Sequence, residues 1–214
     1  MSRPKQCTLV LVRHAHTELA GTFCGAADPP LSAKGIAQLA DLEQRLQAWP
    51  LTHIFSSGLL RARQTAESIA GRGGLQVQYL DSLRELSFGT WEGLAWEQVV
   101  ARDPEYAQRW LGLHPSVPAP GGEDLADFAS RITSAMTGIA AQVGNGCAAV
   151  VTHAGVIRTF LGDVAAAQGI PYDLTCCDYA SCRELWRENG RWRLAGAATS
   201  TTTVDCAVVA RRGD

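Results

Sequence analysis

Two histidines stand directly after apolar runs that are typical of buried strands. His14 follows the run 8–12 and Arg13, and His153 follows the run 147–152. Because ligands of open α/β sheets bind outside the carboxyl ends of the strands, both imidazoles are expected to face one crevice. A neutral imidazole can act as a nucleophile or as an acid–base group near neutral pH. This pair is therefore the first candidate for chemistry.

Arg61 is expected in the first turn of a helix over 60–70, which follows a short strand over 52–56. A cation at this end of a helix opposes the helix dipole. The placement makes sense if an anion binds there, because the helix N–H groups and the guanidinium would both face it. In the alternative interpretation, Arg61 and Arg63 belong to a solvated helix face.

A carboxylate would complete such a site, and two candidates lie close together in the sequence. Glu85 lies among apolar residues in the segment 83–93, where it is a candidate general acid and base. Glu92, in the same segment, is the rival candidate. In the alternative interpretation, either residue is an ordinary loop glutamate.

A metal site is one competing interpretation of the histidines. His14, His16 and His153 could form part of a ligand set, but no matching cluster of Asp or Glu accompanies them. The seven cysteines include no CxxC pair and no zinc-ribbon spacing. The sequence therefore predicts neither a bound metal nor another cofactor.

Strands and amphipathic helices alternate along most of the chain, and this alternation must position the candidate residues. Helices are expected after the N-cap Ser32, over 60–70, over about 125–139 and over about 156–167. Asn189-Gly190, between two strand-like segments, predicts a β-hairpin. Together these patterns predict an α/β fold, a three-layer α/β/α sandwich whose mostly parallel central sheet has an antiparallel edge.

The segment 94–122 interrupts this alternation. It is expected to be a helical or loop lid, inserted in a single domain that spans residues 1–214. Its aromatic residues either stack on a nucleoside-like substrate or pack the insertion; they are Trp96, Tyr106, Trp110 and His114.

The charge balance gives no general attraction to polyanions. Lys and Arg number 19 and Asp and Glu number 21, a formal net charge of −2, so no binding to nucleic acid or to a membrane surface is expected. No stretch approaches the ~20 apolar residues of a membrane span, and we expect a cytoplasmic protein. The hairpin leaves a sheet edge that could pair across a two-fold axis, so a homodimer stays open.

Five segments, in chain order, together resemble the motifs of the histidine phosphatase (phosphoglycerate mutase-like) superfamily. They are Arg13-His14-Ala15-His16-Thr17, the segment 30–35, Arg61-Ala62 with Gln64-Thr65-Ala66, Glu85 before Phe88-Gly89, and His153-Ala154-Gly155-Val156. Within that superfamily, the segments 81–92 and 120–123 are most similar to the α-ribazole phosphatases of cobalamin biosynthesis.

The resemblance implies a phosphoric monoester hydrolase of the histidine acid phosphatase type, which hydrolyses a small-molecule phosphate ester through a phosphohistidine. It implies that His14 is the nucleophile and Glu85 the proton donor. It also implies that the phosphate and substrate contacts are Arg13, Thr17, Arg61, Glu85, His153 and Ala154. α-Ribazole 5′-phosphate is one expected substrate. Phosphoryl transfer of the phosphoglycerate mutase type and non-catalytic binding of a phosphoester are the alternatives.

Two residues beside His14 depart from the family pattern. Ala15 stands where glycine is preferred, and His16 stands where glutamate is frequent. Neither change removes a catalytic group, but both alter the charge and the space next to the expected nucleophile. The substrate preference therefore stays open, and His16 is a rival nucleophile.

Overall fold

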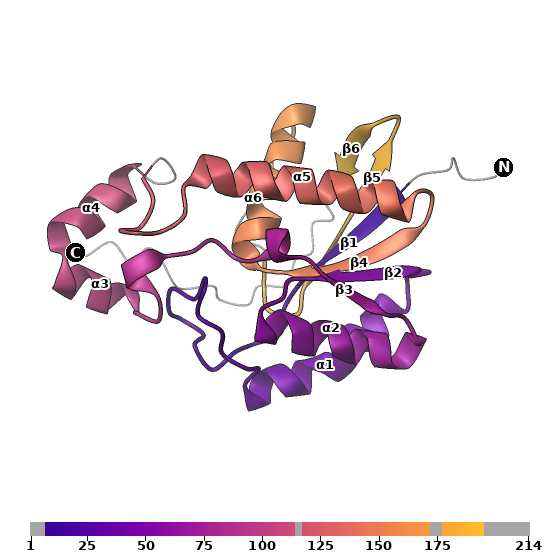
Figure 1. The fold of residues 1–214 in the computed structure, drawn as a ribbon, viewed down its shortest axis with the longest axis horizontal. Helices are drawn as coiled ribbons and strands as arrows, with labels where there is room; N and C mark the ends of the chain where they lie inside the picture. Colours follow the sequence, from indigo (N-terminus) through magenta and orange to yellow (C-terminus); the bar gives the residue numbers. More distant parts are fainter. Residues whose placement is uncertain (1–6, 114–116, 172–176, 195–214) are drawn as a thin grey trace.

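The described residues, 7–113, 117–171 and 177–194 of the computed structural model, form a six-stranded mixed sheet (Figure 1). In spatial order its strands are β3 (Val77–Tyr79), β2 (His53–Ser56), β4 (Cys147–Thr152), β1 (Cys7–Arg13), β5 (Cys182–Glu188) and β6 (Arg191–Leu194). The first four run parallel, whereas β5 pairs antiparallel with both β1 and β6. The predicted mostly parallel sheet with an antiparallel edge is confirmed.

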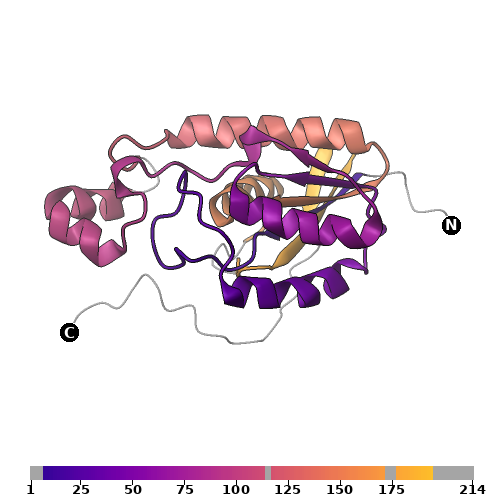
Figure 2. The same cartoon turned by 60° about the horizontal axis from the view of Figure 1, so that its bottom comes forward.

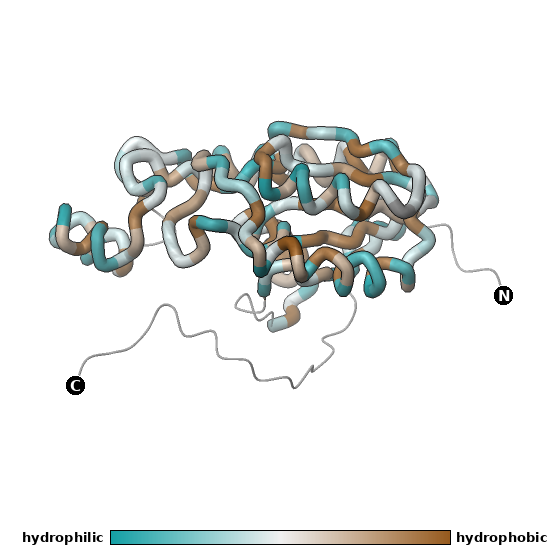
Figure 3. Tube along the Cα trace, turned by 90° about the horizontal axis from the view of Figure 1, so that it is seen from below, coloured by the Kyte–Doolittle hydropathy of each residue, from teal (hydrophilic) through white to brown (hydrophobic). Residues whose placement is uncertain are grey.

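Helices cover both faces of the sheet and make it a three-layer sandwich (Figures 1 and 2). Helices α1 (Ala33–Leu46) and α2 (Leu60–Gly73) lie on one face, and α5 (Leu125–Val143) and α6 (Ala154–Gln168) lie on the other. The central strands β1 and β4 are buried between the two helical layers, which explains their nearly unbroken apolar sequence. The hydropathy colouring of Figure 3 shows hydrophobic stretches along these strands in the interior.

The start of α1 is determined by a local hydrogen bond. Ser32 Oγ accepts a hydrogen bond from Gly35 N at 3.2 Å, so Ser32 is the N-cap that the sequence predicts. Asp124 caps α5 in the same way, with Oδ1 accepting from Ala126 N at 2.7 Å. Helix α6 begins at Ala154, immediately after His153, two residues earlier than expected.

The predicted hairpin joins β5 and β6 through a two-residue turn. Asn189 and Gly190 have φ angles of 50° and 77°, in the left-handed region that a type I′ turn requires. The hairpin places β6 at the edge of the sheet, while β5 packs Leu185 into the core with no exposed surface.

Two short helices, α3 (Trp96–Arg102) and α4 (Pro104–Leu113), occupy the segment that was expected to be an insertion. Figures 1 and 2 show them set apart from the sandwich, at one end of the molecule. They enclose a small core of their own around Trp91, which is only 2% exposed. Within the residues that the structure describes, no helix has the length and apolarity to cross a membrane.

Candidate active site

The carboxyl ends of β1 and β4 bring the two histidines together. These strands are neighbours with Arg13 opposite Thr152, so the next residues, His14 and His153, emerge side by side. The backbone N–H of His14 donates to Thr152 O at 2.9 Å, and the two ring centroids are 5.0 Å apart. The convergence expected from the two strand-to-histidine junctions is present.

His14 is held in one tautomer. Its Nδ1 lies 2.8 Å from Ala15 O, and because a carbonyl oxygen can only accept, Nδ1 carries the proton and Nε2 carries a lone pair. Burial, and then the positive charges of Arg61 and Arg13, hold the pKa of His14 well below its usual value. The sequence indicated the two arginines, but burial is the larger cause. His14 is therefore a neutral imidazole with a free nucleophilic nitrogen.

Arg61 is fully buried, which rules out the solvated-face interpretation for this residue. Its guanidinium donates to the backbone oxygens of Ala27 at 2.6 Å, Gly25 at 2.9 Å and Cys24 at 3.1 Å. Arg63 is different, since it is half exposed and pairs with Glu67 across one helical turn at 3.5 Å. The helix thus directs Arg61 into the site and Arg63 toward solvent.

Glu92 holds the loop that receives Arg61. Its carboxylate accepts hydrogen bonds from four backbone N–H groups, those of Gly25, Ala26, Ala27 and Phe88, at distances of 2.8 to 3.0 Å. It does not line the cavity described below. Glu92 therefore anchors the carbonyl groups around Arg61, and of the two glutamates only Glu85 lines the same cavity as His14.

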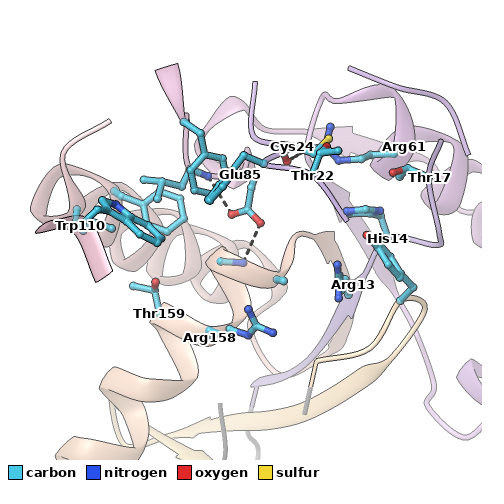
Figure 4. A pocket seen from close by; sticks show the side chains of 18 residues that line it. Arg13, His14, Thr17, Thr22, Cys24, Arg61, Glu85, Trp110, Arg158 and Thr159 are labelled. Atoms are coloured by element: carbon cyan, nitrogen blue, oxygen red, sulfur yellow. Dashed lines mark hydrogen bonds between the residues drawn. The ribbon is translucent and has the colours of Figure 1, made fainter. Parts of the chain in front are cut away.

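Glu85 lies over the N-terminus of α6 (Figure 4). Its Oε2 accepts from Gly155 N at 2.9 Å, and its Oε1 accepts from Leu86 N at 3.0 Å. These two N–H groups fix the carboxylate at the wall of a cavity whose volume is about 390 Å³. The same cavity is lined by the other expected residues Arg13, His14, Thr17, Arg61 and Ala154.

His153 does not line the cavity but lies behind it. It is fully buried, its Nε2 is 2.9 Å from Ser57 Oγ, and its Nδ1 has no hydrogen-bond partner. Burial, followed by the neighbouring His14 and Arg61, lowers its pKa well below the usual value. His153 is therefore neutral, and its ring lies beside that of His14.

The rival nucleophile His16 lies outside the cavity. Its Nδ1 is 2.8 Å from Ser32 Oγ, and its backbone N–H donates to Gln38 Oε1 at 2.9 Å, so this residue ties the nucleophile loop to α1. Within the described ranges, no group of three or more His, Cys, Asp or Glu side chains is arranged to hold a metal ion.

Several residues of the cavity wall were missed by the sequence analysis. Tyr179 lies under the guanidinium of Arg13, with 3.7 Å from Arg13 Cζ to the ring centroid, while Arg13 Nη1 donates to Cys177 O at 2.6 Å. Arg158 and Thr159 line the cavity from α6. A helical spacing of four from Ala154 and Gly155 could have identified the last two, but no local signal indicates Tyr179.

Unpartnered donors gather around His14. Among the described residues, the buried side-chain nitrogen and oxygen atoms without a hydrogen-bond partner are Arg13 Nε, Arg61 Nε, His153 Nδ1 and Ser181 Oγ. Three of these four atoms belong to Arg13, Arg61 and His153. The two arginines are the positive charges that act on His14, and the ring of His153 lies beside that of His14. A buried polar atom without a hydrogen-bond partner raises the free energy of the folded protein. A cluster of such atoms therefore marks a place that suits an anion.

Residues 9–199 match the family model of the histidine phosphatase superfamily (branch 1). The chain belongs to the histidine phosphatase superfamily. The chain is 32% identical over 185 residues to phosphoserine phosphatase 1 of Hydrogenobacter thermophilus, which covers 86% of this chain and 88% of that protein. The match to other curated relatives is partial: it covers 46% of the length of a Mycobacterium bovis relative and 60% of the length of a probable phosphoglycerate mutase of Salmonella.

Solved structures of histidine phosphatases have the same fold. A candidate alpha-ribazole-5′-P phosphatase of Escherichia coli K-12 superposes with a TM-score of 0.76 at 25% identity, over 88% of this chain and 94% of that one. A mycobacterial glucosyl-3-phosphoglycerate phosphatase superposes with a TM-score of 0.72 at 26% identity, over 87% and 96%. These neighbours differ in the leaving group that their names imply.

Four aromatic side chains stand out among the residues that line the cavity. Phe23, Phe88, Phe128 and Trp110 line the cavity. Among the described aromatic residues of the expected lid, Trp110 lines the cavity, whereas Trp96 and Tyr106 only pack around Trp91, as Trp110 also does. His114 lies outside the described residues. The packing alternative therefore holds for Trp96 and Tyr106, and substrate contact remains open for Trp110.

Proposed function

We propose that the protein is a metal-independent phosphomonoesterase that transfers the phosphoryl group of a small-molecule ester to His14 and then to water. One observation carries this proposal: the lone pair of His14 Nε2 lies among the unpartnered donors of Arg13, Arg61 and His153, next to a cavity with Glu85 on its wall. Phosphoryl transfer needs this combination of an in-line nucleophile and positive groups around the equatorial oxygens.

In the first step His14 Nε2 forms a bond to phosphorus, and the bond from phosphorus to the ester oxygen breaks. Glu85, which Gly155 and Leu86 hold in place, gives a proton to the departing oxygen. The products of this step are the free alcohol and a phosphohistidine. The Nδ1–H of His14 keeps donating to the carbonyl oxygen of Ala15 throughout, which keeps the ring aligned.

In the second step the Glu85 carboxylate takes a proton from water while the water oxygen attacks phosphorus. The phosphorus–nitrogen bond breaks, its electron pair returns to Nε2, and inorganic phosphate leaves. Arg13, Arg61 and His153 stabilise the charge of the transferring group in both steps, with Thr17 and Ala154 as the neighbouring contacts. Loss of one such donor costs on the order of 3 kcal/mol of transition-state stabilisation.

We propose α-ribazole 5′-phosphate as the first substrate to test. The aromatic wall of Phe23, Phe88, Phe128 and Trp110 suits an aromatic leaving group, and a structural neighbour is described as an alpha-ribazole-5′-P phosphatase. Phosphoserine is the second candidate, because the relative at 32% identity is a phosphoserine phosphatase. The cytoplasmic location, the lid role of 94–122, the single domain over 1–214 and the homodimer remain predictions.

The test compares wild-type protein with His14→Ala and His16→Ala, using p-nitrophenyl phosphate in the presence of EDTA. His16→Ala is the matched control, since His16 is two residues away and outside the cavity. We expect turnover and an acid-labile, base-stable phosphoenzyme in the wild type and in His16→Ala, and neither in His14→Ala. Turnover retained by His14→Ala would refute the nucleophile, and activity restored only by Zn²⁺ or Mn²⁺ would refute the metal-independent route.

The substrate panel contains α-ribazole 5′-phosphate, phosphoserine and 3-phosphoglycerate. We expect the highest kcat/KM with α-ribazole 5′-phosphate. A preference for phosphoserine would replace the substrate and keep the mechanism, whereas conversion of 3-phosphoglycerate to its isomer would show a mutase. Tight phosphate binding with no turnover of any ester would show a phosphoester-binding protein.

A further inference from the structure

Ser57 is a buried hydroxyl behind the catalytic pair, at the carboxyl end of β2. It has no exposed surface, and its backbone N–H donates to Val151 O at 3.0 Å, which fixes it against β4. Its Oγ accepts from Leu59 N at 3.3 Å and lies 2.9 Å from His153 Nε2. The mechanism above gives this hydroxyl no part, although it is within hydrogen-bond distance of the His153 ring.

The hydrogen bonds of Ser57 determine which nitrogen of His153 carries the proton. If Nε2 were protonated, it would donate to Ser57 Oγ, the serine hydroxyl hydrogen would have no acceptor, and the lone pair on Nδ1 would have no donor. If Ser57 donates to Nε2, both of those groups are satisfied and Nδ1–H alone is left. The second arrangement leaves fewer buried polar groups unpaired, so it is the favoured one.

The strand order indicates where the remaining N–H points. Strand β4 lies between β2 and β1, so Ser57 at the end of β2 and His14 at the end of β1 flank His153 on opposite sides. With Nε2 turned toward Ser57, Nδ1 is turned away from it, toward the side of His14. Arg61 and Arg13 are the positive charges that act on His14, and their Nε atoms likewise lack partners.

We propose that Ser57 is a positioning residue that holds His153 in its Nδ1–H tautomer, so that this N–H is the donor presented to the transferring phosphoryl group. In the opposite tautomer a lone pair would face the phosphoryl oxygens, and the interaction would become repulsive. The inference rests on the proposed phosphoryl transfer to His14, but it concerns the proton on a different residue and is measured independently. The low pKa of His153 supports it, because the ring then donates as a neutral imidazole.

The first test is the ¹⁵N spectrum of the histidine side chains in the whole protein, with the His153 signals assigned by comparison with His153→Gln. In the wild type we expect a protonated Nδ1 and an unprotonated Nε2 for His153. In Ser57→Ala we expect the proton to redistribute between the two nitrogens. A wild-type His153 protonated on Nε2, or an unchanged tautomer in folded Ser57→Ala, would overturn the proposal.

The second test is kinetic. Ser57→Ala is expected to lower kcat by roughly 10- to 100-fold with little change in KM, because part of a transition-state donor is lost. Ser57→Thr, which keeps a hydroxyl, is expected to recover most of kcat and the wild-type tautomer. Equal loss in Ser57→Ala and Ser57→Thr would indicate disturbed packing and overturn the positioning role.

Ser56→Ala is the matched control. Ser56 is equally buried and adjacent in sequence, but its hydroxyl donates to the backbone oxygen of Ser57 at 2.9 Å instead of contacting a histidine. It should leave kcat and the His153 tautomer unchanged, and a Ser56→Ala effect as large as that of Ser57→Ala would overturn the proposal. Failure of the phosphohistidine route is distinguishable, since it would abolish phosphoenzyme trapping and leave the ¹⁵N result intact.

Discussion

Gly155 is the position at which one methyl group can test the proton-donor role of Glu85. Its N–H donates to Glu85 Oε2 at 2.9 Å, and a Cβ at residue 155 would lie 2.2 Å from Glu85 Oε1. The nearest obstacles are the Oε1, Cδ and Oε2 atoms of that one side chain, which can move. Gly155→Ala is therefore expected to displace the carboxylate and to leave the fold in place.

The size of the effect follows from the contact distances. To reach ordinary van der Waals separation from the new methyl group, the Glu85 carboxylate must retreat by about 1 Å. A proton donor must lie within roughly 2.6–3.2 Å of its acceptor, so this retreat removes most of the general acid catalysis. We expect kcat/KM for an alkyl phosphate, whose alkoxide must be protonated, to fall by roughly 10²- to 10⁴-fold.

The assay compares two esters that differ in their need for a proton. p-Nitrophenolate leaves without protonation, so Gly155→Ala should reduce the turnover of p-nitrophenyl phosphate only slightly. Gly138→Ala is the control, because Gly138 is on the exposed side of α5 and a Cβ there would have no atom within 4 Å. Equal losses on both esters, or no loss on either, would refute the assignment of Glu85 as the proton donor.

Three further predictions concern stability. Glu92→Gln replaces an acceptor of four N–H groups and should lower the free energy of unfolding by about 2–4 kcal/mol, measured in urea, with kcat/KM also reduced through the loop around Arg61. Trp91→Ala should cost about 3–5 kcal/mol in the same measurement, because this side chain is only 2% exposed at the centre of its cluster. The lowered pKa values of His14 and His153 predict that the protein loses stability in acid. Below the unfolded-state pKa of 6.5, the unfolded chain binds protons that the folded protein does not bind. Each histidine then lowers the free energy of unfolding by up to about 1.4 kcal/mol per pH unit, until the pH reaches its folded-state pKa. Urea unfolding between pH 7 and pH 5 should show a shallower decline in His153→Gln than in the wild type, and parallel curves would contradict the linkage.

The strand-to-histidine junctions were predictable because the information is local. A strand buried on both faces needs an unbroken apolar run, and the polar residue that follows it marks the carboxyl edge of the sheet. The runs before His14 and His153 became β1 and β4, which are adjacent and in register. The N-cap Ser32 and the Asn189-Gly190 turn were readable for the same reason, since each forms its contacts within a few residues.

The distinction between the two glutamates was not predictable, because it depends on contacts between distant segments. Glu92 is satisfied by a loop 65 to 67 residues earlier in the chain, and Glu85 is held by an N–H group 70 residues later. Tyr179 stacks on Arg13 from the far end of the sequence. Periodicity describes which residues share a face of one element, and it contains nothing about which loops meet.

The unpartnered donors would let a protein with a slightly negative formal charge bind an anion at this point, as the proposed function requires. The net charge of −2 gives no long-range attraction, so the affinity must come from groups already oriented in the site. Arg13 and Arg61 use part of each guanidinium on backbone carbonyls, which fixes the side chain while leaving its Nε without a partner. His14, buried between them, cannot neutralise that positive charge because it is itself neutral. A phosphoryl group would satisfy the donors and the charge together, and these interactions grow as negative charge develops on its oxygens. In the proposed reaction, the same burial that holds His14 unprotonated would therefore also concentrate the field that stabilises the transferring group.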